Sequence, residues 1–470
     1  MVVGEIIHEK DLVVIGAGPA GYEAAIRAAE YGRDVTLVDR SKAGGACLHS
    51  GCIPSKLLAI SARKMWETAP GVRMERTFSM TDWQSEKTAV IESLKKGLHG
   101  KFKSQGIELV TGSASFLSKK RLGVEQGEKF EVWTFQNVIL ATGSTPRIPI
   151  FLKEVTDKVI PIEGLYNLPR IPRKLIIFGA DTYSTEAASS FQALGADVTL
   201  ITEERTLMGE LDESIGRELK RQFKKQEIRV IAGAKDIKVN EDGELLSVAV
   251  IASGEPVHLS ADTIGFSSGR NSNVQSLGLK QADITLTEDN HIEIKETCET
   301  SISGIYACGD ITLGAPLAAK AIQQGKTAAD HCCGVAAAFS LDFIPTVVHT
   351  QTPISSVGLT EREAVEAGYE VSTKSLPMRA NGYAALNRMT EGVVKVIRDQ
   401  ESHLLLGFHV MGAGAVELIE KATLALEMAA RDEDFTYPYV PHPGFGELWT
   451  EAIDLSIQKI RNEEIIGKSF

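Results

Sequence analysis

Residues 11–39 read DLVVIGAGPAGYEAAIRAAEYGRDVTLVD, and this stretch decides the fold of the chain. It predicts a short apolar strand over Asp11–Ile15, a glycine turn, a helix over Tyr22–Tyr31 and a second strand over Asp34–Val38 that ends at Asp39. In such a β-α-β unit the glycines let the backbone approach a pyrophosphate at the helix N-terminus, and the terminal acid binds a ribose hydroxyl. The ordered combination favours a dinucleotide site over a glycine turn with only a structural role.

A second informative stretch, CLHSGCIPSK, spans residues 47–56. Its two cysteines are five positions apart, which on a straight helix separates their Cα atoms by about 7.5 Å. A disulfide spans at most ~7 Å between Cα atoms, so the start of the helix predicted over Ser55–Met65 must be bent. Gly51 permits the bend, and Pro54 suits a first helical turn because its φ is fixed and its missing N–H is not needed there.

The predicted environment of Cys47 and Cys52 is that of exchange-active thiols. The positive end of a helix and the nearby Lys56 are both expected to lower a thiol pKa. An inert disulfide and half of a zinc site are the alternatives, although zinc needs two more ligands and the other four cysteines form no CxxC pair. Electron exchange between a dithiol and a nicotinamide needs an intermediary that reacts with both, so we assign the first dinucleotide site to FAD.

A second β-α-β pattern is predicted between residues 174 and 201, with a degenerate glycine motif. Only Gly179 remains, and Asp181 and Ser184 stand where the other two glycines are expected. A carboxylate at the point of closest approach repels a pyrophosphate, because like charges about 4 Å apart cost ~1 to 4 kcal/mol. We therefore expect NADH to bind at least about tenfold more weakly than to an intact motif, with a purely structural unit as the alternative.

Length and charge exclude several classes of function. At 470 residues the chain suggests about three domains. Its formal net charge of −12 argues against a nucleic acid or an anionic membrane as a partner. No stretch approaches the ~18 uninterrupted apolar residues of a membrane span, and the first residues show no signal-peptide pattern, so we expect a cytoplasmic protein. Six cysteines are too few for a secreted disulfide scaffold, which favours a catalytic role for the reactive pair.

The C-terminal part, from residue 346 on, alternates predicted strands and helices and indicates a compact α+β domain. Its tail reads PHPGFGE over residues 441–447. His442 lies between two prolines and five positions before Glu447, which is the arrangement of an oriented imidazole that serves as a general acid or base. A merely solvated histidine is the alternative.

Taken together, these segments resemble the flavin disulfide reductases, also called the pyridine nucleotide-disulfide oxidoreductase family. The resemblance covers nearly the whole chain, and within the family the CIPSK ending and the GVVKV segment are most similar to lipoamide dehydrogenases. It implies an α/β fold with two Rossmann-like dinucleotide-binding domains and a C-terminal α+β dimerisation domain. The expected parts are residues 1–150 (FAD-binding, first part), 151–272 (NAD-binding-like), 273–345 (FAD-binding, second part) and 346–470 (dimerisation).

The resemblance also implies roles for individual residues. Cys52 would face the flavin, Cys47 would exchange with the substrate, and His442, steered by Glu447, would come from the other subunit of a homodimer and carry the proton. Lys56 would pair with Glu186 beside the flavin. The expected cofactors are FAD and NAD, and the expected substrate is dihydrolipoamide on a lipoyl-bearing protein or a small dithiol; another electron carrier or a non-enzymatic flavoprotein component is the alternative. The expected cofactor-binding residues are Gly16, Gly18, Gly21, Asp39, Lys56, Ala114, Gly143, Asp310, Gly179, Glu186 and Gly269.

Overall fold

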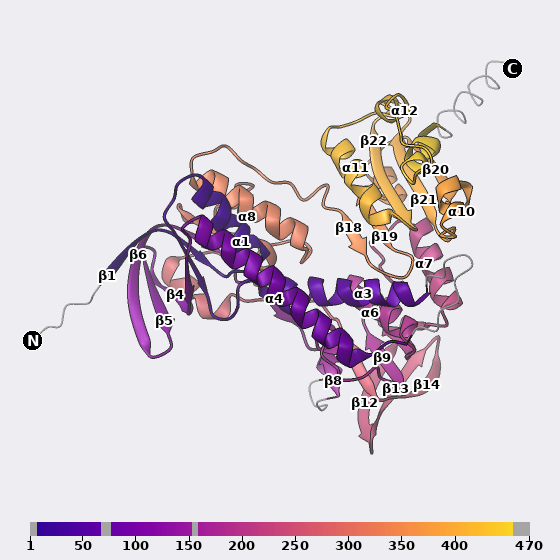
Figure 1. The fold of residues 1–470 in the computed structure, drawn as a ribbon, viewed down its shortest axis with the longest axis horizontal. Coiled ribbons are helices and arrows are strands. Elements are labelled where there is room, and N and C mark those ends of the chain that lie inside the picture. Colours follow the sequence, from indigo (N-terminus) through magenta and orange to yellow (C-terminus); the bar gives the residue numbers. More distant parts are fainter. Residues whose placement is uncertain (1–6, 67–76, 153–157, 455–470) are drawn as a thin grey trace, which may run out of the picture. The chain divides into compact units, whose positions relative to one another are not determined.

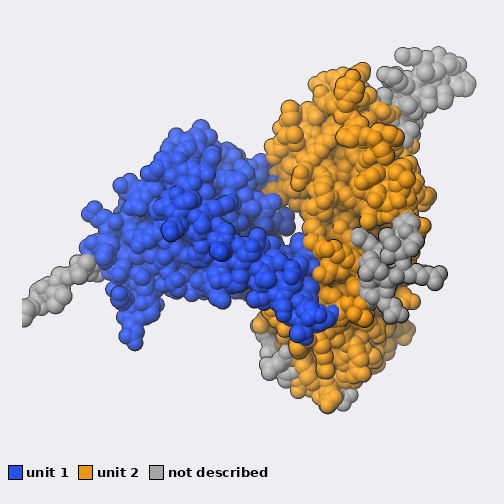
Figure 2. Space-filling view, viewed as in Figure 1, with its two compact units in different colours: residues 1–57, 79–147, 268–341 blue, residues 58–78, 148–267, 342–470 orange. Residues whose placement is uncertain are grey.

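A computed structural model describes residues 7–66, 77–152 and 158–454 of the chain. It divides into two compact units, each built from separate stretches of sequence (Figure 2). Unit 1 comprises Met1–Leu57, Ser79–Arg147 and Ser268–Leu341, and unit 2 comprises Leu58–Phe78, Ile148–Ser267 and Asp342–Phe470. The two units are defined by compactness, whereas the four predicted parts are defined by function. The predicted domain limits therefore stay a prediction.

Unit 1 is built on a sheet with the strand order β3-β2-β1-β6-β5-β4, and β17 pairs with β6. The parallel pairs are β3-β2, β2-β1, β1-β6 and β6-β17, whereas β4, β5 and β6 form an antiparallel meander. The elements of unit 1 are β1 (Ile7–Ile15), α1 (Pro19–Glu30), β2 (Val35–Asp39), α2 (Gly45–His49), the start of α3 (Cys52–Trp66), α4 (Met80–Ser104), β3 (Glu108–Thr111), β4 (Ser113–Ser118), β5 (Arg121–Gln126), β6 (Lys129–Leu140), β7 (Ser144–Pro146), β16 (Arg270–Ser272), η2 (Gln275–Leu277), η3 (Leu279–Ala282), β17 (Ile305–Ala307), η4 (Gly309–Ile311) and α8 (Ala318–Cys332).

Helices α1 and α8 pack side by side in unit 1 (Figure 1). Small buried residues permit the close approach, among them Ala24, Ala28 and Ala328. A Cβ atom at Gly325 of α8 would lie 2.2 Å from the Ala20 carbonyl oxygen of α1. This packing fixes α1 beside the parallel strands, so its N-terminus is held at their carboxyl ends.

Unit 2 contains the second β-α-β unit and the C-terminal sheet. The parallel sheet has the order β11-β10-β9-β15-β8, and the antiparallel sheets have the orders β12-β13-β14 and β18-β19-β22-β21-β20. The elements of unit 2 are the rest of α3, η1 (Ile150–Leu152), β8 (Val159–Pro161), α5 (Ile162–Leu165), β9 (Lys174–Phe178), α6 (Thr182–Ala193), β10 (Asp197–Thr202), α7 (Glu213–Lys225), β11 (Arg229–Ala232), β12 (Lys235–Asp242), β13 (Leu245–Ala252), β14 (Glu255–Ala261), β15 (Thr263–Phe266), β18 (Thr346–Val348), β19 (Ile354–Gly358), α9 (Glu361–Glu366), β20 (Val371–Pro377), η5 (Met378–Ala380), α10 (Gly382–Leu386), β21 (Val393–Asp399), β22 (Leu405–Met411), α11 (Ala415–Glu427) and α12 (Glu433–Thr436).

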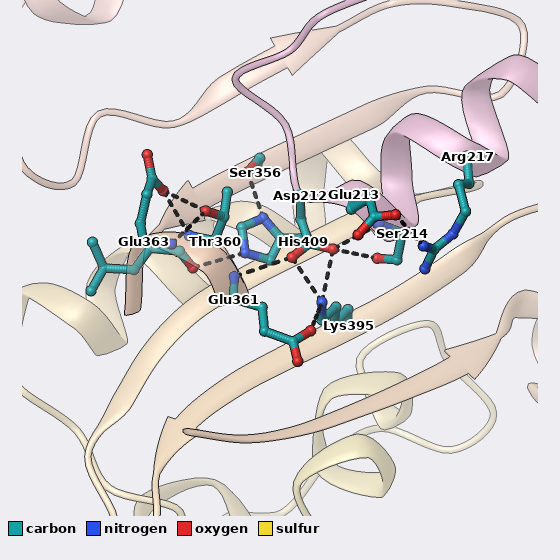
Figure 3. A network of polar contacts seen from close by, with 11 residues as sticks. Asp212, Glu213, Ser214, Arg217, Ser356, Thr360, Glu361, Glu363, Lys395 and His409 are labelled. Atoms are coloured by element: carbon teal, nitrogen blue, oxygen red, sulfur yellow. Dashed lines mark hydrogen bonds and ion pairs between the residues drawn. The ribbon is translucent and has the colours of Figure 1, made fainter. Parts of the chain in front are cut away.

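A buried polar network ties the start of α7 to the C-terminal sheet within unit 2 (Figure 3). Asp212, the N-cap residue of α7, accepts hydrogen bonds from Lys395 of β21 at 2.9 and 2.8 Å. Lys395 also donates to Glu361 of α9 at 2.6 Å. The fully buried His409 of β22 contacts the Ser356 hydroxyl at 2.6 Å. The network therefore joins elements that are far apart in the sequence.

The predicted α/β fold class is confirmed, and both predicted β-α-β units are present. The helix of the second unit begins at Thr182, directly after Asp181, which caps it. Residues 447–454 form the start of a helix after the PHPGFGE segment, and residues 455–470 lie outside the described part of the chain.

Candidate active site

The turn between β1 and α1 is shaped by its glycines. Gly16 has φ +106°, and a Cβ atom there would lie 2.3 Å from the Ala141 carbonyl oxygen. A Cβ atom at Gly21 would lie 1.7 Å from the Gly16 carbonyl oxygen. Gly18 is the N-cap residue of α1, and no side chain caps this helix start in the described structure. The backbone N–H groups there are suited to a pyrophosphate, and contact of the three glycines with FAD stays a prediction.

Asp39 ends β2 at the position predicted for a ribose contact. Its Oδ2 atom accepts a hydrogen bond from the Ala17 backbone N–H at 2.6 Å, and its Oδ1 atom accepts one from the Ser41 N–H at 2.8 Å. The carboxylate is thereby held beside the glycine turn. This position is compatible with binding a ribose hydroxyl at the end of the strand.

The exit of β6 is linked to Asp310 by side chains that the sequence did not single out. The Ser144 hydroxyl donates to Asp310 Oδ2 at 2.6 Å, and Arg270 Nε donates to the Ser144 Oγ atom at 2.7 Å. Gly143, next to Ser144, has φ +68°. Ser144 and Arg270 were missed as positioning residues because they lie far apart in the sequence and meet only where β7 pairs with β16.

The other two predicted contacts of unit 1 have clear places in the structure. Ala114 is buried on β4, opposite Val124 of β5. Gly269 has φ +83°, and its carbonyl oxygen accepts a hydrogen bond from the Arg147 N–H at 3.0 Å. Contact of Ala114 with FAD and of Gly269 with a dinucleotide both stay predictions.

The bend predicted between the two cysteines is confirmed. Cys47 lies in the short helix α2, and Cys52 is the first residue of α3. Ser50 interrupts the helix with φ −136° and ψ −18°, and the Gly51 N–H donates to the Ala46 carbonyl oxygen at 2.7 Å. A Cβ atom at Gly51 would lie 3.2 Å from that oxygen, so a side chain at the bend would be tightly packed.

Both thiols are half-buried, and they interact with each other. The predicted lowering of the pKa was wrong for Cys47. A hydrogen bond with Cys52, burial, and the charge on Cys52 raise the pKa of Cys47, and Lys56 opposes them without outweighing them. The physical reason is that two adjacent thiols cannot both ionise easily, so a single lysine does not suffice.

The His442 and Glu447 side chains meet in unit 2, as the tail pattern predicts. His442 Nδ1 lies 2.7 Å from Glu447 Oε1, and the Gly444 N–H donates to Glu447 Oε2 at 2.9 Å. The hydrogen bond from His442 lowers the pKa of Glu447. The imidazole is 82% exposed. It is therefore oriented through one nitrogen and open to a proton donor or acceptor at the other.

Some predicted contacts join residues of different units. Lys56 belongs to unit 1 and Glu186 to unit 2, so their pairing stays a prediction. Glu186 is buried on α6, where its Oε1 atom accepts a hydrogen bond from the His349 N–H at 2.8 Å. The proposed meeting of His442 with the thiols, across a subunit boundary, likewise stays a prediction.

The second β-α-β unit fits a dinucleotide poorly. Gly179 has φ +150° and keeps the first turn of the motif, since a Cβ atom there would lie 2.7 Å from the Ser267 carbonyl oxygen. The start of α6, however, is capped by the Asp181 side chain, which accepts from the Ser184 N–H at 2.9 Å. The pyrophosphate position expected for NAD is thus filled by a residue of the chain itself.

Unit 1 combines a glycine turn before an uncapped helix start with a pair of interacting thiols. This combination is typical of flavin-linked dithiol oxidoreductases. The chain belongs to the pyridine nucleotide-disulphide oxidoreductase family: residues 10–325 match that family, and residues 344–453 match its dimerisation domain. The family assignment confirms the predicted resemblance, the enzyme class, and FAD with a pyridine nucleotide as the family's cofactors. The dimerisation domain supports the predicted homodimer.

Known relatives are similar over nearly the full length. The chain is 34% identical to a dihydrolipoyl dehydrogenase of Geobacillus stearothermophilus, covering 97% of this chain and 98% of the relative. It is 33% identical to one from Thermus scotoductus, covering 94% and 96%. The solved structure of LpdA from Mycobacterium tuberculosis shares the fold with a TM-score of 0.88 at 24% identity, covering 95% of this chain and 99% of that one. The HOCl-induced flavoprotein disulfide reductase RclA from Escherichia coli shares it with a TM-score of 0.86 at 23% identity, with the same coverage.

Within residues 7–66, 77–152 and 158–454, no helix combines the length and the apolar character of a membrane span. Over the same ranges, no three histidine, cysteine or acidic side chains are grouped so that they could hold a metal ion.

Proposed function

We propose that this chain is an FAD-dependent oxidoreductase that oxidises dihydrolipoamide, or a similar dithiol, on a lipoyl-bearing protein in the cytoplasm. The observation that carries the proposal is the pair of interacting thiols at Cys47 and Cys52, placed on either side of a helix break. Relatives named dihydrolipoyl dehydrogenase, at 34% identity over nearly the whole length, support the choice of substrate.

The reaction begins from the oxidised pair, in which Cys47 and Cys52 form a disulfide. One thiolate of the substrate attacks the sulfur of Cys47, which breaks the bond to Cys52 and forms a mixed disulfide. The second thiolate of the substrate then attacks the substrate's first sulfur, which is bound to Cys47, and so releases the Cys47 thiolate. The substrate leaves as a cyclic disulfide, and two electrons remain on the cysteine pair. FAD, when bound, supplies the two-electron acceptor for the reduced pair.

His442 takes up the proton that the substrate thiol must lose. Glu447 holds Nδ1 at 2.7 Å, which leaves Nε2 as the basic nitrogen. Gly16, Gly18, Gly21 and Asp39 would hold the nucleotide part of FAD. Lys56, Gly143 and Asp310 would lie along the rest of it.

NAD⁺ is the final electron acceptor that the family suggests, because its cofactors are FAD and a pyridine nucleotide. A second candidate keeps the dithiol chemistry but delivers the electrons to a different carrier. The specific observation in its favour is the capped start of α6, where Asp181 takes the place of a pyrophosphate. In this candidate Gly179, Glu186 and Gly269 serve the fold rather than a second dinucleotide.

Stopped-flow mixing of the purified flavoprotein with dihydrolipoamide, NADH or NADPH tests the proposal. We expect dihydrolipoamide to reduce the flavin and to give a long-wavelength absorption band from the Cys52 thiolate. Cys52→Ser should abolish the band, whereas Cys47→Ser should show it without reduction because Cys52 is then a free thiolate. Cys332→Ser, at a half-buried thiol elsewhere in unit 1, is the matched control and should leave the spectra unchanged. A yellow protein that does not react with dihydrolipoamide would instead point to a non-enzymatic flavoprotein component.

A further inference from the structure

The start of α6 is closed by hydrogen bonds of the chain itself. Asp181 is its N-cap residue, and Asp181 Oδ1 accepts from both the Ser184 N–H and the Ser184 hydroxyl at 2.9 Å. Asp181 Oδ2 accepts from the Ser267 hydroxyl, one residue beyond the end of β15. Both carboxylate oxygens are therefore engaged inside the unit.

The start of α1 provides the direct comparison within the same chain. It follows a parallel strand in the same way, but its N-cap residue is Gly18 and no described side chain caps it. The four first N–H groups of a helix need acceptors, which a bound anion or a side chain supplies. At α1 these groups are left for a ligand, whereas at α6 a carboxylate supplies the negative charge.

Ser184 holds the Asp181 cap in place at the start of α6. It is fully buried, at the position where the third glycine would let helix and strand pack closely. Its Cβ atom would lie 2.9 Å from a Cβ atom placed at Gly179. Ser184 can therefore pack at this position only because Gly179 has no side chain.

The loop after β10 adds further negative charge beside this helix start. The Met208 N–H donates to the Ala180 carbonyl oxygen at 2.9 Å, so the loop is fastened to the glycine turn. Burial raises the pKa of Glu210, and the charges of Glu204 and Asp181 raise it further. An anion at the start of α6 would meet these carboxylates as well.

We infer that Asp181, held by Ser184 and Ser267, is a specificity-determining residue that occupies the anion position of the second β-α-β unit and excludes a dinucleotide pyrophosphate. One consequence rests on the proposed dithiol function: the electrons taken from the dithiol would leave the flavin through an acceptor that has no diphosphate. At Asp181 itself the exclusion is by occupancy, whereas the loop carboxylates of Glu204 and Glu210 are the same in the wild type and in every variant tested below. An asparagine at this position should therefore still block the site, because asparagine caps a helix as well as aspartate does.

The test compares NADH binding to the FAD-loaded wild-type protein and to three variants by equilibrium dialysis. Asp181→Gly combined with Ser184→Gly opens the site, Asp181→Asn removes only the charge, and Asp197→Asn removes a charge from an exposed residue elsewhere in the unit. We expect at least a tenfold gain in affinity for the double variant and no gain for the other two. Faster flavin reduction by NADH should accompany the gain.

Two results would overturn the inference. One is micromolar NADH binding by the wild-type protein that the double variant does not improve. The other is a full gain from Asp181→Asn alone, which would show that charge and not occupancy excludes the nucleotide. Asp181→Asn keeps the cap and should fold normally, so the second result can be read even if the double variant is unstable. Flavin reduction by dihydrolipoamide is measured on the same samples, and its absence would refute the proposed function without touching the binding result.

Discussion

Replacing Lys395 by methionine should destabilise the junction between α7 and the C-terminal sheet. Lys395 is 6% exposed and Asp212 is 2% exposed, and the ammonium group lies 2.9 and 2.8 Å from the two carboxylate oxygens. Methionine keeps most of the side-chain volume but removes the charge and its hydrogen bonds to Asp212 and Glu361 (Figure 3). The perturbation therefore isolates the ion pair from the packing.

The expected cost follows from what Asp212 would retain. Its remaining donors are the Ser214 N–H at 2.9 Å, the Ser214 hydroxyl at 2.6 Å and the Glu361 N–H at 3.2 Å. These leave a buried carboxylate without a counter-charge, and breaking a buried pair in this way costs about 3–5 kcal/mol. Adding Asp212→Asn to Lys395→Met should restore part of the loss, because no uncompensated charge then remains.

The same pair predicts a dependence on pH. Burial alone would raise the pKa of Asp212, but hydrogen bonds from Lys395 and Ser214 outweigh it and hold that pKa well below its ordinary value. A lowered pKa stabilises the fold above the unfolded value of about 3.9, and this contribution is lost as the pH falls through the folded value. The difference between wild type and Lys395→Met should therefore be largest near neutral pH and shrink in acid.

Hydrogen exchange of the β21 and α7 amides is the suitable assay, because a flavoprotein of several domains does not unfold in a single step. We expect exchange in both elements to accelerate by about two orders of magnitude or more in Lys395→Met, since each 1.4 kcal/mol is a factor of ten. Arg217→Met is the matched control: it removes a cation that pairs with Glu213 of the same helix at 2.6 Å, but both side chains are exposed. Equal effects of the two substitutions would refute the reasoning.

Two further predictions concern the active site. His442→Gln should lower turnover of dihydrolipoamide by about 10²- to 10⁴-fold with FAD still bound, and Glu447→Gln should cost less; an unchanged rate in the histidine variant would leave the tail a structural role. Gly21→Ala should lower the FAD content, measured by the ratio of absorbance at the flavin and protein bands, because its Cβ atom would collide with the Gly16 carbonyl oxygen. Gly100→Ala, where nothing lies within 4 Å, is the control, and equal FAD content in both variants would contradict the role of Gly21.

Local patterns predicted much of the fold and the site. Both β-α-β units, the bend at Gly51 and the pairing of His442 with Glu447 depend on residues close together in the sequence. Apolar strands, turn glycines and prolines restrict the backbone directly, so short segments suffice to predict them. The same is true of the acid at the end of β2.

Contacts over long sequence separations could not be predicted in this way. Ser144 meets Asp310 across 166 positions, and Lys395 meets Asp212 across 183. The pKa of Cys47 was misjudged for a related reason. Its direction depends on the burial of the thiol and on the orientation of Cys52, and both are tertiary properties that spacing does not determine.

In the second β-α-β unit the sequence identified the important residue, Asp181, but not the way in which it acts. The sequence indicates a carboxylate at the start of α6, and from this alone we predicted that it repels a pyrophosphate. Where the carboxylate points depends on the Ser267 hydroxyl, 86 positions away, and on the Ser184 N–H. With its oxygens turned toward these donors, Asp181 caps α6 as a bound phosphate would cap α1. Repulsion predicts that neutralising the charge restores binding, whereas occupancy predicts that it does not, so Asp181→Asn separates the two mechanisms.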